Sequence, residues 1–220
     1  RVGLGGGGRP GPAAGAGAHV YVLDTGIRPE HGQFGGRVVP TLDLTRGRGV
    51  EVCDRGDTQC ALDRNGHGTA AASLAGGRTL GVAPGATLHA VKVLRDDNTG
   101  HVTWIAQAID WILVHGIRPA VVSLSIDNVA MRALGLLSQA WPRGEGPLSF
   151  VVAAGNDAAQ LHCTGAESLP PVVTVVGAVD SRDEVAAFSG HGDCVDIYAP
   201  GVYVRAASIW HDSAEADFSG

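Results

Sequence analysis

The sequence lacks any long uninterrupted apolar segment. No run approaches the roughly 18–20 apolar residues that a membrane-spanning helix needs, and residues 1–18 contain no apolar core of a secretory signal, which leaves room for a signal and a pro-segment already removed. The chain also lacks a basic excess, because 16 Lys and Arg stand against 22 Asp and Glu, for a formal net charge of −6. Nucleic-acid binding needs a basic surface. We therefore expect neither a membrane span nor a nucleic-acid partner.

Cysteine is scarce, and its spacing fits no zinc site. The four residues are Cys53, Cys60, Cys163 and Cys194. One Cys-x6-Cys pair followed by two distant single cysteines does not match the close ligand pairs of zinc sites. Four cysteines permit three pairings, and the even number favours disulfides, with buried thiols as the alternative. Disulfides form in oxidising compartments, so a secreted or extracytoplasmic location is expected.

The residues that are abundant predict one folded domain. Hydrophobic residues make up 45% of the 220, enough to fill a single large core, and 33 Gly and 11 Pro indicate many tight turns. Residues 1–17 (RVGLGGGGRPGPAAGAG) are too rich in Gly, Pro and Ala to hold a periodic face and predict a flexible lead. The domain is expected to occupy residues 18–220.

Short β-rich runs recur along this domain. Their continuous apolar character is typical of strands that are covered on both faces. Small residues 70–75 (AAASLA) suit a helix packed closely against a sheet. Strands that alternate with helices predict an α/β fold with a parallel sheet, whose ligands gather at the carboxyl ends of the strands. The predicted strands are residues 19–23, 87–94, 120–124, 148–153, 172–176 and 195–198.

Two further helices are predicted from apolar residues at helical spacing. Thr103 is expected to cap the first, and Gly116 is expected just past its end. Its repeating apolar residues are Ile105, Ile109, Ile112 and Leu113. The second is predicted after Asn128, with Met131, Leu134, Leu137 and Trp141 in the same rhythm.

Asp24-Thr25-Gly26 directly follows the predicted strand HVYVL, which places a carboxylate at the carboxyl edge of the sheet. A capping or turn aspartate has the same pattern. Aspartic peptidases also carry Asp-Thr-Gly, as half of a two-aspartate site. A single chain of that class needs a second such motif, and none appears in the sequence. A homodimer could supply it, but the order of strands and helices is wrong for that class.

Two more motifs place polar side chains at element ends. His67 lies in Asn-Gly-His-Gly-Thr at a predicted helix start, where the helix dipole favours a neutral imidazole able to accept a proton. Asn156 ends Val-Val-Ala-Ala-Gly-Asn, a predicted buried strand. Its amide can donate a hydrogen bond to a developing oxyanion without adding charge. A surface histidine and a turn-capping asparagine are the alternative interpretations.

Together these three motifs resemble the subtilisin family of serine peptidases, in particular its proteinase K-like branch. The resemblance runs from residue 15 to residue 220 and includes GAGAHVYVLDTGI, GVAPGATLHAVKVL, AAGN, VGAVD and CVDIYAPG. It implies a three-layer α/β fold with a central parallel sheet, here without its C-terminal helices. It also implies a serine endopeptidase in which Asp24 orients the imidazole, His67 is the general base and acid, and Asn156 is the oxyanion donor.

The resemblance places the nucleophilic serine beyond the printed chain. In the family it lies in Gly-Thr-Ser, and the chain ends Phe218-Ser219-Gly220, where that motif begins. Ser219 precedes the motif's glycine and is therefore not the nucleophile. The 220-residue chain alone is accordingly expected to be inactive. A different class of function is also open: a catalytically inactive subtilisin-like module that retains a peptide-binding groove.

The resemblance also implies that a peptide or protein substrate binds by strand addition. The matching residues are Asn98, Thr99, Gly100, Ser125, Ile126 and Asp127, with Ala153, Ala154 and Gly155 as one pocket wall. Where relatives have Ser-Leu-Gly-Gly, this chain has Ser125-Ile126-Asp127-Asn128, so its preference for the pocket residue is open. Ala70 replaces a histidine usual after Gly-His-Gly-Thr. A removed pro-segment acting as inhibitor is a further expected partner.

Two structural features follow from the same resemblance. Cys163 is expected to pair with Cys194, which leaves Cys53 and Cys60 to close a short local loop. A structural calcium ion is expected on the Asp196 carboxylate and the carbonyls of Pro171 and Val173, with water completing about 6–8 ligands. A turn-capping role for Asp196 is the alternative.

Overall fold

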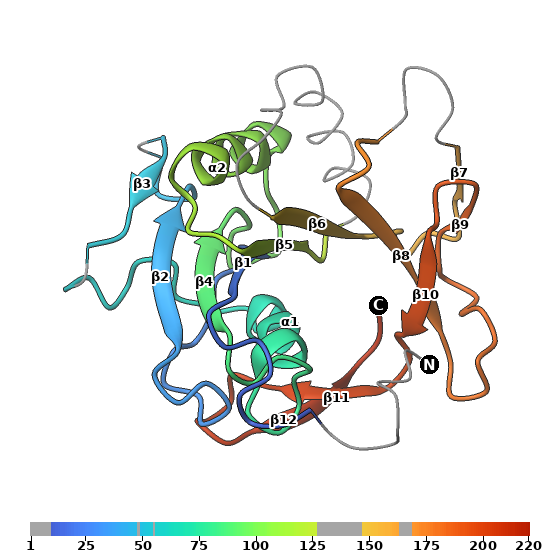
Figure 1. Ribbon diagram of the computed structural model, residues 1–220, viewed down its shortest axis with the longest axis horizontal. Coiled ribbons are helices and arrows are strands. Elements are labelled where there is room, and N and C mark those ends of the chain that lie inside the picture. Colours follow the sequence, from blue (N-terminus) through green and yellow to red (C-terminus); the bar gives the residue numbers. More distant parts are fainter. Residues whose placement is uncertain (1–9, 48, 55, 127–146, 163–168) are drawn as a thin grey trace.

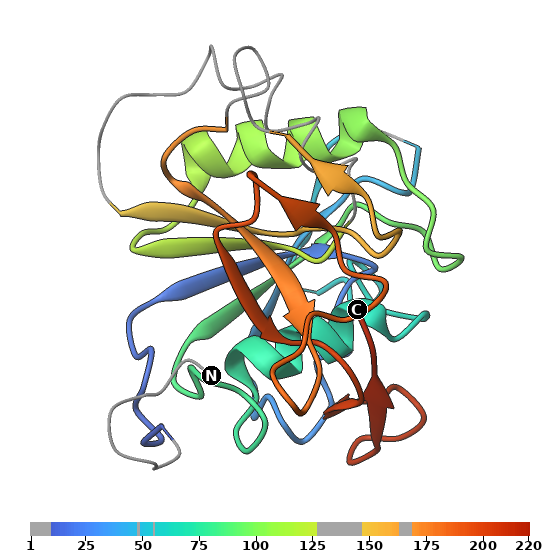
Figure 2. The ribbon, with the colours of Figure 1, turned by 90° about the vertical axis from the view of Figure 1, so that its right-hand side faces the viewer.

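The fold is built on an eight-stranded sheet that lies between two helices. A computed structural model describes residues 10–47, 49–54, 56–126, 147–162 and 169–220. The strand order is β10-β8-β6-β5-β1-β4-β2-β3, and every pairing is parallel except that of β2 with β3. In Figures 1 and 2 helix α2 covers one face of this sheet and α1 the other. The predicted α/β fold with a central parallel sheet is confirmed.

The strands of the large sheet are short. They are β1 (His19–Asp24), β2 (Val38–Asp43), β3 (Glu51–Val52), β4 (Thr87–Lys92), β5 (Ala120–Leu124), β6 (Leu148–Ala153), β8 (Val173–Val179) and β10 (Ile197–Pro200). Two small sheets stand apart, made of β7 (Gln160–Leu161) with β9 (His191–Gly192), and β11 (Val204–Ala207) with β12 (Glu215–Phe218). All six predicted strand runs fall on strands of the large sheet.

Strand β2 was not predicted, and its sequence explains the omission. Pro40 interrupts the run VVPTLD, and proline lacks the amide donor that a central strand needs. The chain accommodates it with a register shift between Pro40 and Leu42 in the pairing with β4. Proline is tolerated there because β2 is followed only by the two-residue strand β3 at this side of the sheet.

Two hydrophobic cores hold the layers together. Under α2 (Val102–His115), buried Ile105, Ile109 and Ile112 pack with Tyr21 and Phe150 of the sheet. Under α1 (His67–Gly76), small residues allow close packing, and a Cβ added at Gly76 would lie 2.7 Å from Leu88 Cδ2. Burial of apolar side chains on both sheet faces is the main stabilising contribution in such a fold.

The predicted helix at residues 103–115 exists, but its start differs from the prediction. His101 is the N-cap residue, so the expectation that Thr103 caps the helix is wrong. Gly116 follows the helix as expected, with extended rather than left-handed backbone (φ −64°, ψ 134°). The second predicted helix, after Asn128, lies outside the described residues. Within the described ranges, no helix is long and apolar enough to cross a membrane.

The Cys53–Cys60 disulfide closes a loop before α1, with an S–S distance of 2.00 Å. Arg46 stabilises the same region, since its guanidinium forms ion pairs with Asp43, Glu51 and Asp57. Cys194 is also disulfide-bonded, and its expected partner Cys163 lies outside the described residues. Of the predicted flexible lead, residues 1–9 also lie outside, and residues 11–17 form consecutive turns.

A pair of histidines, buried His89 and half-buried His19, joins β1 to β4 beside the α2 core. His89 Nε2 lies 2.9 Å from His19 Nδ1, and the His89 ring stacks on Tyr21 at 4.2 Å between centroids. Thr41 donates its hydroxyl proton to the Val39 carbonyl and therefore accepts from His89 Nδ1, 3.0 Å away. When His89 is neutral, its Nε2 therefore accepts a hydrogen bond from His19 Nδ1. Burial, aided by the His19 charge, lowers the pKa of His89 to about 4.

Candidate active site

The candidate site is centred on a hydrogen-bonded pair, Asp24 and His67. Asp24 ends β1 and is fully buried, and His67 begins α1. His67 Nδ1 lies 2.8 Å from Asp24 Oδ1 and 2.9 Å from Oδ2. Because a carboxylate only accepts, His67 Nδ1 carries the proton, and Nε2 is left as the basic nitrogen. Among the described residues, no serine hydroxyl forms a hydrogen bond with His67.

Glycine allows the elements that carry Asp24 and His67 to approach closely. A Cβ added at Gly68 would collide with the Gly26 carbonyl oxygen and lie 3.1 Å from Asp24 Oδ1. Gly66, the N-cap residue of α1, has a left-handed backbone with φ 111°. The Asn-Gly-His-Gly-Thr motif therefore uses both glycines to bring His67 against Asp24.

The environment of His67 tunes its basicity. The hydrogen bond that His67 donates to Asp24 is the largest influence and raises the pKa of His67 above its ordinary value, whereas burial lowers this pKa. The charges of Asp24 and Asp63 raise the same pKa further. Since 39% of the His67 side chain stays exposed, the imidazole can exchange protons with a bound group.

A cavity of about 340 Å³ gathers six of the twelve predicted catalytic and substrate-binding residues. Adjacent strands β1, β5 and β6 end at one edge of the sheet, so the residues that follow them meet there. The predicted residues that line the cavity are His67, Ser125, Ala153, Ala154, Gly155 and Asn156. Gly220 also lines it, and the Asn156 amide nitrogen lies 3.3 Å from where a Gly220 Cβ would stand.

The other predicted substrate-binding residues lie apart from this cavity lining. Asn98, Thr99 and Gly100 form an exposed turn, in which Asn98 has φ 65° and Gly100 forms an antiparallel bridge with Leu94. Ile126 is buried, with 8% of its surface exposed. Asp127 lies outside the described residues. Within this exposed turn the Asn98 amide donates to the Arg95 carbonyl, the Thr99 amide donates to Asp97 Oδ1, and the Thr99 carbonyl accepts from the Arg95 amide.

The predicted calcium ligands lie near one another at the start of β8. Asp196 accepts a hydrogen bond from Val175 N at 2.8 Å, and its own amide donates to the Val175 carbonyl at 3.0 Å. Val173 begins this strand, and Pro171 is exposed just before it. One carboxylate and two carbonyls are hard oxygen donors, which fits calcium once water completes the shell.

A different group of potential metal ligands occurs in the described ranges at Glu51, Asp57 and Cys60. Cys60 is disulfide-bonded, which removes it as a ligand. Glu51 and Asp57 both pair with Arg46 instead. The guanidinium therefore supplies the positive charge that this group would otherwise take from a metal ion.

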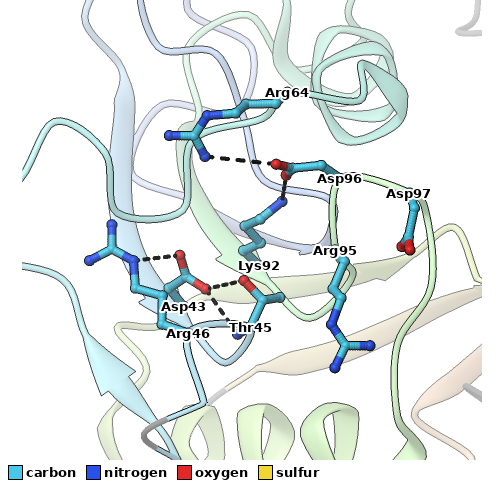
Figure 3. A pocket seen from close by; sticks show the side chains of 8 residues that line it. All are labelled: Asp43, Thr45, Arg46, Arg64, Lys92, Arg95, Asp96 and Asp97. Carbon is cyan, nitrogen blue, oxygen red and sulfur yellow. Dashed lines mark hydrogen bonds and ion pairs between the residues drawn. The ribbon is translucent and has the colours of Figure 1, made fainter.

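A second, charged pocket of about 440 Å³ lies beside the loop that precedes His67. Figure 3 shows its side chains, Asp43, Thr45, Arg46, Arg64, Lys92, Arg95, Asp96 and Asp97. Lys92, although buried, donates to Asp96 Oδ1 at 2.8 Å and to the Thr25 carbonyl. Arg64 lies 4.0 Å from Asp96, and Arg95 stacks over Trp104. Lys92 thereby fixes the turn that follows Asp24.

Sequence reasoning missed two residues that support the site, Lys92 and Asp63. Asp63 is 3% exposed and lies four residues before His67. A lone aspartate before a helix is an ordinary turn residue in sequence, and a lysine within an apolar run carries no functional signal. The Asp-x-x-Gly spacing before a helix start was the available clue, because aspartate commonly accepts amide hydrogen bonds two and three residues ahead.

Comparison with known proteins identifies relatives across nearly the whole chain. The family model described as "Subtilase family" matches residues 15–218. An "Extracellular serine proteinase" of Thermus sp. is 38% identical over 205 residues, covering 93% of this chain and 46% of that protein. "Subtilase-type proteinase psp3" of Schizosaccharomyces pombe is 37% identical over 212 residues, covering 94% and 44% respectively. The chain thus spans about half the length of these curated relatives.

Solved structures agree with this comparison. The crystal structure of "a cold adapted subtilisin-like serine proteinase" has a TM-score of 0.73 and 29% identity, and the match covers 93% of this chain and 70% of that one. Sphericase has a TM-score of 0.70 at 26% identity, with coverage of 94% and 73%.

Proposed function

Because the chain belongs to the subtilase family, we propose that it carries the acid–base and oxyanion groups of a serine endopeptidase. The observation that carries this proposal is the buried Asp24 carboxylate bound to His67, with Asn156 on the same 340 Å³ cavity. A buried carboxylate, an imidazole and a neutral amide donor are the groups that acyl transfer needs besides a nucleophile. The nucleophile in this proposal is a serine beyond Gly220.

The proposed reaction follows from the orientation of His67. His67 Nε2 takes the proton of the serine hydroxyl as the serine oxygen attacks the scissile carbonyl carbon, which requires an approach of about 3 Å. Asp24 keeps the other ring nitrogen protonated and stabilises the imidazolium that forms. The Asn156 amide donates to the carbonyl oxygen as it becomes negative. The imidazolium then gives its proton to the leaving amine, and water repeats the sequence on the acyl-enzyme.

The proposed substrates are peptides or proteins outside the cytoplasm. An extended substrate pairs with the exposed backbone of Asn98, Thr99 and Gly100 and with residues 125–127, while one side chain enters the pocket beside Ala153, Ala154 and Gly155. The disulfide at Cys53–Cys60 and the printed name of the Thermus relative support secretion.

Replacing the proposed oxyanion donor tests this function. In a chain extended beyond Gly220 through a complete subtilase domain, Asn156→Ala is expected to lower kcat by about 10²–10³-fold, the loss that removal of this donor causes in subtilisin, with KM little changed. Chromogenic peptide hydrolysis measures both constants. Asp157→Ala, next to it but outside the cavity lining, is the matched control and should keep wild-type kcat. A loss of less than threefold for Asn156→Ala would argue against the proposed role.

Calcium bound by Asp196, Pro171 and Val173 is proposed to stabilise the fold without taking part in the reaction. At free calcium 100-fold above Kd, binding contributes about 2.7 kcal/mol, which corresponds to roughly 5–10 °C in Tm for a chain of this size. Thermal unfolding with calcium and with chelator measures the difference. Asp196→Asn should abolish it, and exposed Asp193→Asn should not. An identical wild-type Tm in both buffers would refute the site.

A further inference from the structure

Asp63 is a buried carboxylate that accepts five hydrogen bonds, and none of the proposed catalytic steps uses it. Its Oδ1 accepts from Thr25 Oγ1 at 2.8 Å and from the amides of Asn65 and Gly66 at 2.9 Å. Its Oδ2 accepts from the Thr69 amide at 2.9 Å and the Thr69 hydroxyl at 2.6 Å. Charge-assisted hydrogen bonds of this kind are about twice as strong as neutral ones.

These bonds join the two elements that carry the catalytic pair. Thr25 follows Asp24 directly, and Gly66 and Thr69 flank His67 at the start of α1. Thr25 adds a second link, since its hydroxyl oxygen accepts from Gly68 N at 3.0 Å while it donates to Asp63. The amides at the start of α1 have no partner within the helix, so Asp63 satisfies donors that would otherwise stay unpaired in a buried place.

We propose that Asp63 is a positioning residue for catalysis, which fixes His67 against Asp24 through Thr25 and Thr69 and places a second negative charge near the imidazole. The role of Asp63 in catalysis rests on the proposed endopeptidase function. The negative charges of Asp24 and Asp63 both raise the pKa of the His67 imidazole. At the N-terminal end of α1 a buried carboxylate also interacts favourably with the helix dipole.

An NMR titration of His67 in the 220-residue chain tests whether the negative charge of Asp63 raises the pKa of the imidazole. Asp63→Asn removes the negative charge and leaves one acceptor oxygen for donors that now bind two. The expected result is a fall in the pKa of His67 relative to the wild type, because one of the charges that raise it is removed. Asp43→Asn is the matched control, because Asp43 is equally buried at 3% exposure and hydrogen-bonds Thr45 and Ala61 instead. The chain has nine histidines, and the resonance of His67 is identified as the one that is absent in His67→Ala.

A second pair of variants tests the positioning while all charges are kept. Thr25→Val removes the hydroxyl that links Asp63 to Gly68, and Thr45→Val removes the equivalent hydroxyl bound to Asp43. The Nδ1 proton of His67 reports the bond to Asp24 through its low-field resonance. Thr25→Val is expected to shift this resonance upfield and speed its exchange with solvent, and Thr45→Val to leave it unchanged.

An unchanged His67 pKa in Asp63→Asn, or an equal fall in Asp43→Asn, would overturn the proposal. If Asp63→Asn does not fold, the Thr25→Val variant tests the proposal instead. A His67 Nδ1 proton resonance at the wild-type position in Thr25→Val would overturn the proposal. None of these measurements requires peptide cleavage, so failure of the proposed endopeptidase activity is distinguishable from failure of this inference. In an extended, active domain the same Asp63→Asn change should lower kcat with KM little altered, and move the acid limb of the pH profile to lower pH.

Discussion

The 220-residue chain is expected to hydrolyse no peptide bond, whereas a chain extended beyond Gly220 by Thr-Ser and the remainder of a subtilase domain should be active. Asp24 and His67 prepare a base, but this mechanism needs a hydroxyl within about 3 Å of the imidazole. In the described ranges the His67 ring hydrogen-bonds to Asp24 alone. In the extended chain, His67→Ala should lower kcat by about 10⁶-fold, as loss of the catalytic base does in subtilisin.

A chromogenic peptide assay with and without phenylmethylsulfonyl fluoride measures this difference. The extended chain with its new serine replaced by alanine is the control and should match the short chain. Sulfonyl-fluoride-sensitive cleavage by the 220-residue form, lost in His67→Ala, would show that a serine within residues 1–220 is the nucleophile. Peptide binding without cleavage by the extended chain would instead favour an inactive binding module.

Asp24→Asn should lower kcat of the extended domain by about 10⁴-fold with little change in KM. The variant keeps the size of the side chain but loses its charge, and its amide can hold His67 in the wrong tautomer, with the proton on the nitrogen that must act as base. Because Asp24 is the main influence that raises the pKa of His67, the remaining activity should begin at lower pH than in the wild type. The neutral base is present only above that pKa.

Kinetics as a function of pH measure both effects. Asp43→Asn, at a similarly buried carboxylate away from His67, is the control and should retain the wild-type acid limb. A loss of less than tenfold in kcat for Asp24→Asn would contradict the assigned role. An unchanged acid limb would show that Asp24 does not set the basicity of His67.

The parts of the fold that could be predicted from sequence are those with continuous apolar runs. Strand β1 is buried on both faces and strand β6 is a continuous apolar run with one face only partly buried, so both were recognisable, and Asp24 and Asn156 lie at or just after their ends. Strand β2 was not predictable, since Pro40 is stabilised there only by its place beside a two-residue edge strand. The start of α2 was set at Thr103 because His101 carries no usual capping signal.

The candidate site, like the fold, could be predicted from the sequence only in part. The Asp24–His67 contact was expected only from the family resemblance of the combined motifs, and in the structure the two side chains are hydrogen-bonded. Asp63 and Lys92 both contact Thr25, which is distant from them in sequence, so a local pattern predicts at most the amide hydrogen bonds of Asp63 and not these contacts. The roles of Asn98 and Asp196 depend on a substrate and an ion, and they stay predictions.

The burial of His89, together with its contact with His19, makes the stability of this fold sensitive to acid. In the unfolded chain His89 has an ordinary pKa near 6.5, but in the folded protein burial lowers the pKa to about 4. Above pH 6.5 the imidazole is neutral in both states, and as pH falls to 4 only the unfolded state takes up the proton. Stability is therefore lost across this window, by up to about 3 kcal/mol. The proposed reaction needs neutral His67 and the fold is stabilised by neutral His89, so mild acid is expected to lower both the fraction of active base and the stability of the fold.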